Sequence, residues 1–200
     1  MTSQSLRSHN LRLPSFGLIV PTQWSRVDTS DKAKFEAIGD QLTKLLPDQS
    51  DARIRQDVFD YWRSLVDTNV TQYFTYARPA RDKALIQIFI CTIGQFDANP
   101  DQEFQDAAQD LFRSLDQGWD APPPMLTMHE NASGEYFRAE RLIEEPGKWP
   151  WEASREVQYL FRHPVFPVYA LLTGVSPNTE IPEISAQFDQ VAATFFWLPS

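Results

Sequence analysis

The sequence predicts an α+β domain in which a mostly antiparallel β-sheet has helices on both faces, as a three-layer α/β/α sandwich. Residues 84–93 and 166–175 are apolar at nearly every position, which is typical of strands covered on both sides. Apolar residues recur every three or four positions in further segments, which indicates amphipathic helices over 30–46, 50–65, 99–118 and 182–195. Between residues 125 and 163 apolar and polar residues alternate, as expected for a β-meander.

The N-terminal half begins with a polar, aperiodic segment. We expect residues 1–12 to form a flexible tail and residues 13–200 to form one domain, because no linker or repeat divides the chain. A short strand is expected over 16–20, and the ring of Trp24 should fold back onto the core. The two helices that follow begin after Ser30 and Ser50, which are suitable N-cap residues.

The second half contains the other strands of the predicted sheet. Residues 72–77 and 84–93 should form two strands, and Asn99-Pro100-Asp101 should begin a helix. The meander strands are expected over 125–129, 135–143, 155–163 and 166–175, with a turn at 131–134.

Charge is divided unevenly along the chain. The protein has a net charge of −9, and residues 101–200 hold 6 basic and 16 acidic residues. Such a balance repels phosphate backbones and anionic membrane surfaces, so we expect neither as a partner. No stretch approaches the ~18 apolar residues that span a bilayer, so we expect no membrane insertion. The start of the sequence lacks the apolar stretch of a signal peptide, and Cys91 has no second cysteine to pair with. These features favour a cytoplasmic location.

The residues that common reaction classes require are not arranged in a recognisable pattern. His9, His129 and His163 are scattered, and none has metal-ligand spacing to another His or to a Cys. The seven glycines form no phosphate-binding loop. Residues 97–108 imitate a calcium loop but carry Gln102 and Ala108 where that loop needs Gly and a carboxylate. We therefore predict no catalytic residue, no metal and no cofactor.

One loop is the candidate binding site. Trp149-Pro150-Trp151 lies in a connection that also holds Glu144, Glu145 and Lys148. Tryptophans in such a loop either anchor a protein partner or pack beneath the loop. Packing is the favoured explanation, because exposed aromatic patches are uncommon on monomers.

The core pattern is similar to that of a known group of proteins. The segments 16–24, 84–93, Val157-Gln158-Tyr159, Tyr169-Ala170-Leu171-Leu172 and 187–195 resemble actinobacterial proteins of similar length. Those proteins resemble the PsbP-like (Ran-binding-protein-like) α/β/α sandwich, which includes mycobacterial LpqN-type lipoproteins and chaperones of type VI secretion effectors. The resemblance implies binding and scaffolding rather than catalysis. This chain lacks the signal peptide and lipid-accepting cysteine of the lipoproteins.

The leading hypothesis is a non-enzymatic protein-binding, adaptor or scaffold protein whose partner is an unidentified protein or a second copy of the chain. The alternative is a small ligand-binding domain or enzyme with a pocket between the sheet and the 144–152 loop. Convergence of His163, Arg141 or Glu156 in a deep pocket would favour that alternative. A third possibility is homodimerisation through an exposed edge strand.

Overall fold

The computed structural model describes residues 14–22, 24–27, 33, 37, 40, 70–79, 84–95, 103–115, 125–144, 153–176, 179, 181 and 183–199. The predicted tail over 1–12 lies outside the described residues. So do the predicted helices over 30–46 and 50–65, apart from Ala33, Ala37 and Asp40, which are helical.

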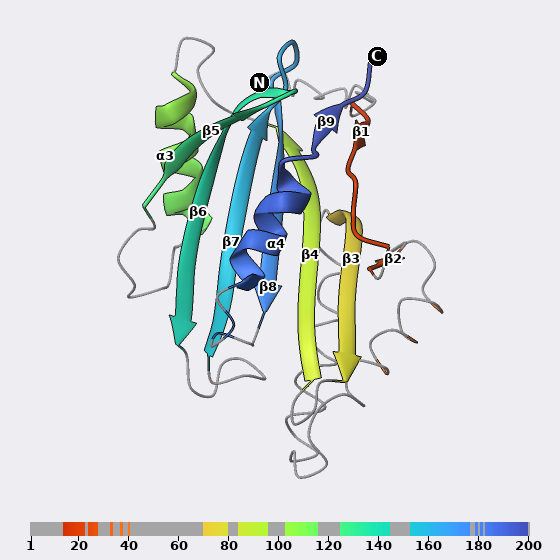
Figure 1. Cartoon of the computed structure of the whole chain (residues 1–200). Coiled ribbons are helices and arrows are strands. Elements are labelled where there is room, and N and C mark those ends of the chain that lie inside the picture. The colour runs from red at the N-terminus through yellow and green to blue at the C-terminus, as the bar shows by residue number, and fades with distance from the viewer. Residues whose placement is uncertain are drawn as a thin grey trace, which may run out of the picture.

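Long antiparallel strands make up most of the described structure (Figure 1). The chain forms β1 (Phe16–Gly17), β2 (Ser25–Val27), β3 (Val70–Pro79), β4 (Ala84–Gln95), α3 (Phe104–Leu115), β5 (Thr127–Asn131), β6 (Gly134–Glu144), β7 (Ala153–Arg162), β8 (Val168–Ser176), α4 (Glu183–Ala192) and β9 (Phe196–Trp197). Seven strands form one sheet in the order β2-β3-β4-β8-β7-β6-β5, and β1 pairs with β9 in a separate two-stranded sheet.

The predicted meander is confirmed, since β5, β6, β7 and β8 are neighbours in that order. Its first turn joins Asn131 to Gly134 through two residues. The side-chain Oδ1 of Asn131 accepts a hydrogen bond from the Ser133 amide at 2.8 Å, and Gly134 has a φ of 104°, which a residue with a Cβ rarely adopts. Strands β2 and β9 were not predicted, because two or three residues are too few to show an alternation.

The main core lies on the face of the sheet that α4 covers. It combines residues of β4, β7 and β8 with the buried side of α4 and with aromatic rings from the chain ends. Trp24 is buried there, as predicted, and its ring meets Phe89 and Phe188 edge-on at 6.2 and 6.1 Å between centroids. Phe16 and Phe195 stack at 5.5 Å and extend this core toward the two-stranded sheet.

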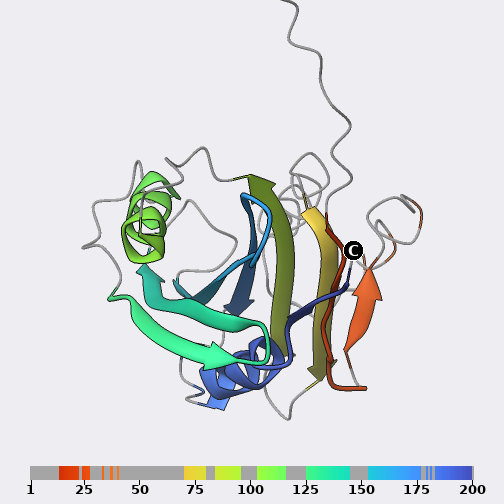
Figure 2. The ribbon, with the colours of Figure 1, turned by 90° about the horizontal axis from the view of Figure 1, so that it is seen from above.

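A smaller core forms where α3 packs against the other side of β6, β7 and β8. It contains Ala108 and Phe112 of α3 with Phe137, Ala139 and Leu160 of the sheet. Alternate strand residues therefore point to different cores, as the two-residue period of a strand requires. Seen from above, α3 and α4 lie on opposite sides of the strands (Figure 2).

The predicted three-layer α/β/α sandwich, in which layers of helices cover both faces of the sheet, is wrong. The described part of the chain is mainly antiparallel strand, and α3 and α4, of 12 and 10 residues, are single short helices that each cover only part of the sheet. The apolar strand residues that suggested helical layers are covered in part by aromatic side chains, among them Phe16, Trp24 and Phe195. An apolar strand face shows that something covers it, but it does not show that a helix does.

Candidate functional site

The binding site predicted in the loop falls outside the described structure. Trp149, Trp151, Glu145 and Lys148 are not among the described residues. Glu144 is described as the last residue of β6, where its backbone pairs with Ala153 of β7. The loop therefore stays a prediction.

The second predicted site required Arg141, Glu156 or His163 to converge in a pocket, and the structure separates them. Arg141 and Glu156 are opposite each other on β6 and β7, and the Nη2 of Arg141 donates to the Oε1 of Glu156 at 2.9 Å. His163 follows the far end of β7, seven residues further on, or about 23 Å along an extended strand. These side chains do not form one site.

His163 has a structural role in the turn after β7. The ring is buried, and its Nδ1 accepts hydrogen bonds from the amides of Val165 and Phe166, both at 3.0 Å. The ring also packs against Phe166 and Trp197. Burial lowers the pKa of His163, and the lone pair that a general base would use already accepts two amides.

The densest polar cluster links β6 and β7 to α4. The Nε of Arg138 donates to the Oδ1 of Asp189 at 2.7 Å, and its Nη2 donates to the Oε2 of Glu140 at 2.7 Å. Tyr159 donates to the Oδ1 of Asp189 at 2.6 Å, while Arg155 and Ser185 donate to the Oε1 of Glu140 at 2.6 and 2.7 Å. Each carboxylate thus receives several donors, and the cluster ties α4 to the sheet.

Glu140 should make the stability of the protein depend on pH. Burial alone would raise the pKa of Glu140, but hydrogen bonds from Ser185, Arg138 and Arg155 outweigh it and hold the pKa below its ordinary value. The charged form therefore stabilises the fold. That contribution is complete above the unfolded-state pKa of about 4.3 and is lost as the pH falls through the lower folded-state pKa.

Urea unfolding of the wild type and of Glu140→Gln between pH 7 and pH 3 measures this contribution. We expect the difference in free energy of unfolding to be constant above about pH 5 and to shrink as the pH falls below about 4. A difference that does not change with pH would show that Glu140 contributes only through its shape.

A pocket of about 390 Å³ opens between α3 and the outer strands β5 and β6, and we call it the α3–β5 pocket. Its apolar lining comes from Phe112, Leu126, Met128 and Phe137. Its polar lining comes from α3, where Gln105, Gln109 and Arg113 follow one another at intervals of four residues and so share one side of the helix.

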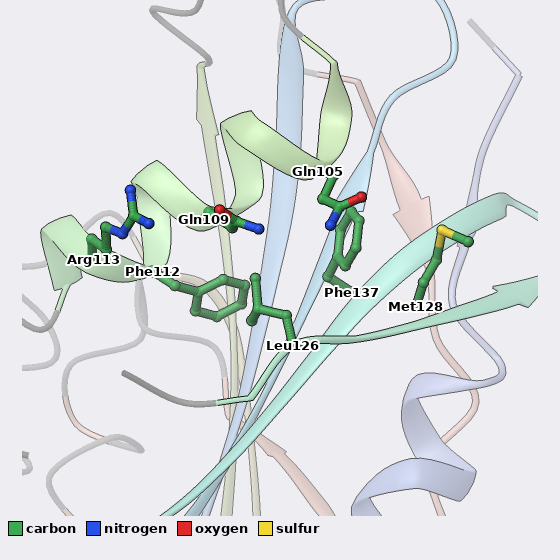
Figure 3. Close-up of a pocket in the computed structure, with 7 residues that line it drawn as sticks. All are labelled: Gln105, Gln109, Phe112, Arg113, Leu126, Met128 and Phe137. Carbon is green, nitrogen blue, oxygen red and sulfur yellow. The ribbon is translucent and has the colours of Figure 1, made fainter. Parts of the chain in front are cut away.

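The two ends of this pocket differ. Figure 3 shows Arg113 at one end and Met128 at the other, with Leu126 and the ring of Phe112 between them. The side chain of Met128 is 61% exposed, and that of Met125 just before the strand is 80% exposed. Unbranched methionine side chains can adapt to the shape of a bound group.

The pocket also lies beside a sheet edge, because β5 is the last strand of the sheet. Asn131 and Gly134 close a two-residue turn, so they form a hydrogen-bonded pair, and such pairs alternate along the hairpin. Met128 and Glu130 are therefore at non-hydrogen-bonded positions, and their backbone N–H and C=O groups point away from β6. A bound strand could pair with them.

Sequence analysis did not identify this pocket. Phe112 is buried, and Gln105 and Gln109 are polar residues of the amphipathic helix predicted over 99–118, for which no partner strand was predicted. The four-residue spacing of Gln105, Gln109 and Arg113 is the only local signal. A glutamine stripe of that kind is common on exposed helices, so it identifies a pocket only once β5 is placed beside it.

The described residues offer no group of three or more His, Cys, Asp or Glu side chains that could hold a metal ion. Among the same residues, neither helix has the length and apolar character needed to cross a membrane. Cys91 is buried in β4, and burial raises the pKa of its thiol. A thiol that stays protonated is a poor nucleophile.

No protein-family model matches the sequence, and no curated protein matches it. The structure is similar to the crystal structure of LpqN, involved in cell envelope biogenesis of Mycobacterium tuberculosis, with a TM-score of 0.48 and 11% sequence identity over 93% of this chain and 84% of that chain. A similarity of this degree carries no argument about function. An LpqN-type protein is thus among those that this chain is similar to, while the PsbP-like fold is not confirmed.

Proposed function

We propose that this protein is a non-enzymatic binding domain that recognises a segment of a partner protein in the α3–β5 pocket. The observation that carries the proposal is the position of the pocket beside the outward-facing backbone of edge strand β5. A partner segment there can place apolar side chains in the pocket while its backbone pairs with the strand.

The chemistry of the lining suits a peptide. Phe112, Leu126 and Phe137 supply an apolar floor for side chains. The carboxamides of Gln105 and Gln109 can each donate and accept hydrogen bonds, as a peptide backbone does. The volume of about 390 Å³ lies within the usual range of ligand pockets, so it can hold two or three side chains.

The roles of the other polar groups support a binding function over catalysis. His163 caps a turn, Arg141 pairs with Glu156, and Asp189 is held by both Arg138 and Tyr159. Each of these groups already serves the fold. The predicted role of the 144–152 loop and the predicted cytoplasmic location stay predictions.

Selection from a phage-displayed library of random twelve-residue peptides tests this function. We expect the wild-type protein to select peptides that share apolar positions, and we expect Met128→Glu to weaken their binding by about tenfold or more. The reason is that an apolar side chain of the bound peptide would remove water from the new carboxylate, which is unfavourable. Isothermal titration calorimetry with the selected peptides measures the effect.

Leu142→Glu is the matched control, because Leu142 is also half exposed on a strand of the same sheet but lies outside the pocket. It should bind the selected peptides as the wild type does. Failure to select any peptide, or equal binding by Met128→Glu and the wild type, would contradict the proposal. Thermal melts of both variants show whether each is folded.

A further inference from the structure

We infer that the segment bound in the α3–β5 pocket is an extended peptide that joins β5 as an antiparallel strand and carries a basic residue near its N-terminal end. The inference rests on the proposed function and deepens it by naming the chemistry of the partner. It is carried by the charges at the two ends of β5 and by the direction of that strand.

A like-charge pair lies beyond the Met128 end of the pocket, on the same face of the sheet. Glu130 of β5 is directly opposite Glu135 of β6, on the same face as Met128 and Phe137. Both glutamates are exposed, and side chains in such a non-hydrogen-bonded pair are close together. Like charges directly opposite each other destabilise a hairpin, so a cation beside Glu130 would offset an unfavourable contact.

Among the described residues, the charged groups near this end make contacts of their own. Arg162 extends from β7 on the same face, and its guanidinium lies over the ring of Phe104, 6.0 Å from the centroid. Phe104 in turn meets the ring of Phe137 at 4.9 Å. At the opposite end of the pocket, Arg113 is 3.5 Å from Asp110. An acidic residue, Glu130, thus lies just beyond the Met128 end of the pocket, and a basic residue, Arg113, lines its far end.

The direction of β5 fixes the direction of the peptide. The chain runs from Leu126 in the middle of the pocket, past Met128 at one end, toward Glu130. An antiparallel partner strand begins beside Glu130, so its first residues meet the two glutamates and its later residues meet the apolar lining. Glu130 is four positions after Leu126, which is about 13 Å of extended chain and matches a peptide of five or six residues.

A second copy of this chain fits the same edge less well. Two β5 strands paired across a two-fold axis would bring the Glu130 and Glu135 pairs of both copies toward one shared interface. Four carboxylates there repel one another, whereas a basic peptide is attracted. Charge complementarity thus favours a basic partner segment over self-association.

Fluorescence anisotropy with labelled peptides tests the inference. The probe is acetyl-Lys-Thr-Val-Thr-Val-Thr-amide, which places the Lys and both Val side chains on the face of the pocket. Two matched peptides carry Gln or Glu in place of the Lys. A third carries the Lys at its C-terminal end instead of its N-terminal end. We expect the Lys-first peptide to bind about tenfold more tightly than the Glu-first peptide at low ionic strength, with the difference shrinking in about 0.5 M salt.

The double variant Glu130→Gln/Glu135→Gln should abolish the preference for Lys and keep the affinity for the Gln peptide. Glu183→Gln, which removes an exposed charge on α4, should change neither the preference for Lys nor the affinity for the Gln peptide. Equal binding of the Lys-first and Glu-first peptides, or of the Lys-first and Lys-last peptides, would overturn this inference. The proposed function would still stand if the Gln peptide binds the wild type and Met128→Glu weakens that binding. If none of the peptides binds, this inference fails, and phage selection judges the proposed function by itself.

N-methylation of alternate amides in the Lys-first peptide tests strand addition separately. It removes backbone donors and keeps the side chains, so binding should be lost if the peptide pairs with β5. Hydrogen exchange at the Met128 and Glu130 amides should slow when the unmodified peptide binds. Equal affinity of the methylated peptide, or a dimer in sedimentation that Met128→Glu dissociates, would overturn the inference.

Discussion

Replacing Phe188 with alanine should lower the free energy of unfolding by about 3 to 5 kcal/mol, as is typical when a buried phenylalanine is truncated. The side chain is 0% exposed, and its ring stacks on Phe89 at 5.8 Å and meets Trp24 edge-on. The two rings come from separate segments of the chain, and each has other contacts, so they cannot both move into the space left behind. Urea unfolding followed by far-UV circular dichroism measures the loss.

A second substitution, at Gly174, tests whether the effect comes from the packing of α4 on the sheet. A Cβ at Gly174 would lie 2.6 Å from the Cγ of Phe188, so the ring rests directly on the backbone of β8. Gly174→Ala alone should cost about 1 to 3 kcal/mol through overpacking. In the Phe188→Ala background, Gly174→Ala should lower the free energy of unfolding much less, because the ring that would overlap the new Cβ is absent.

Two results would contradict this picture of the core. Additive effects of Gly174→Ala and Phe188→Ala would show that the two residues are not in contact. Leu142→Ala, at a half-exposed position of β6, is the control and should change the stability by about 0.5 kcal/mol or less. A loss in Phe188→Ala no larger than in this control would show that α4 does not pack on the sheet as described.

Arg138→Met should lower the free energy of unfolding by about 2 to 3 kcal/mol. Methionine fills most of the same space, but Asp189 and Glu140 lose the guanidinium that bridges them. Removing one partner of a buried ion pair costs about 3 to 5 kcal/mol. We expect less here because the side chain of Asp189 is 43% exposed and water can solvate it.

Arg113→Met is the matched control for this prediction. Arg113 also pairs with an aspartate, but the side chains of Arg113 and Asp110 are about two-thirds exposed. Such a pair contributes about 0.5 kcal/mol or less. Equal losses in Arg138→Met and Arg113→Met, measured by urea unfolding at pH 7, would contradict the structural role of the Arg138 cluster.

The strand and helix positions followed largely from sequence because their signals are local. Alternation in 135–143 and continuous apolar character in 84–93 indicated β6 and β4, and the spacing of Ile184, Phe188 and Val191 indicated α4. Periodicity reports which side of an element is buried and does not report what covers it. For that reason the same signals led to the wrong prediction of helical layers on both faces.

The candidate site could not be predicted, because it depends on neighbours that are distant in the sequence. His163 was named from the sequence as one residue of a possible pocket, and only the positions of the Val165 and Phe166 amides showed that its Nδ1 accepts hydrogen bonds within a turn. The pocket required α3 to lie beside β5. No spacing within either segment indicates that arrangement.

The sequence by itself determined the meander strands and the positions of α3 and α4, because about four to eight residues show the period of a strand and about eleven or more show that of a helix. The tertiary structure alone decided that β5 ends the sheet, that Glu130 faces Glu135, and that Arg138 meets Asp189, 51 residues away in the chain. Those contacts depend on strand order and register, which are set by packing across the whole domain.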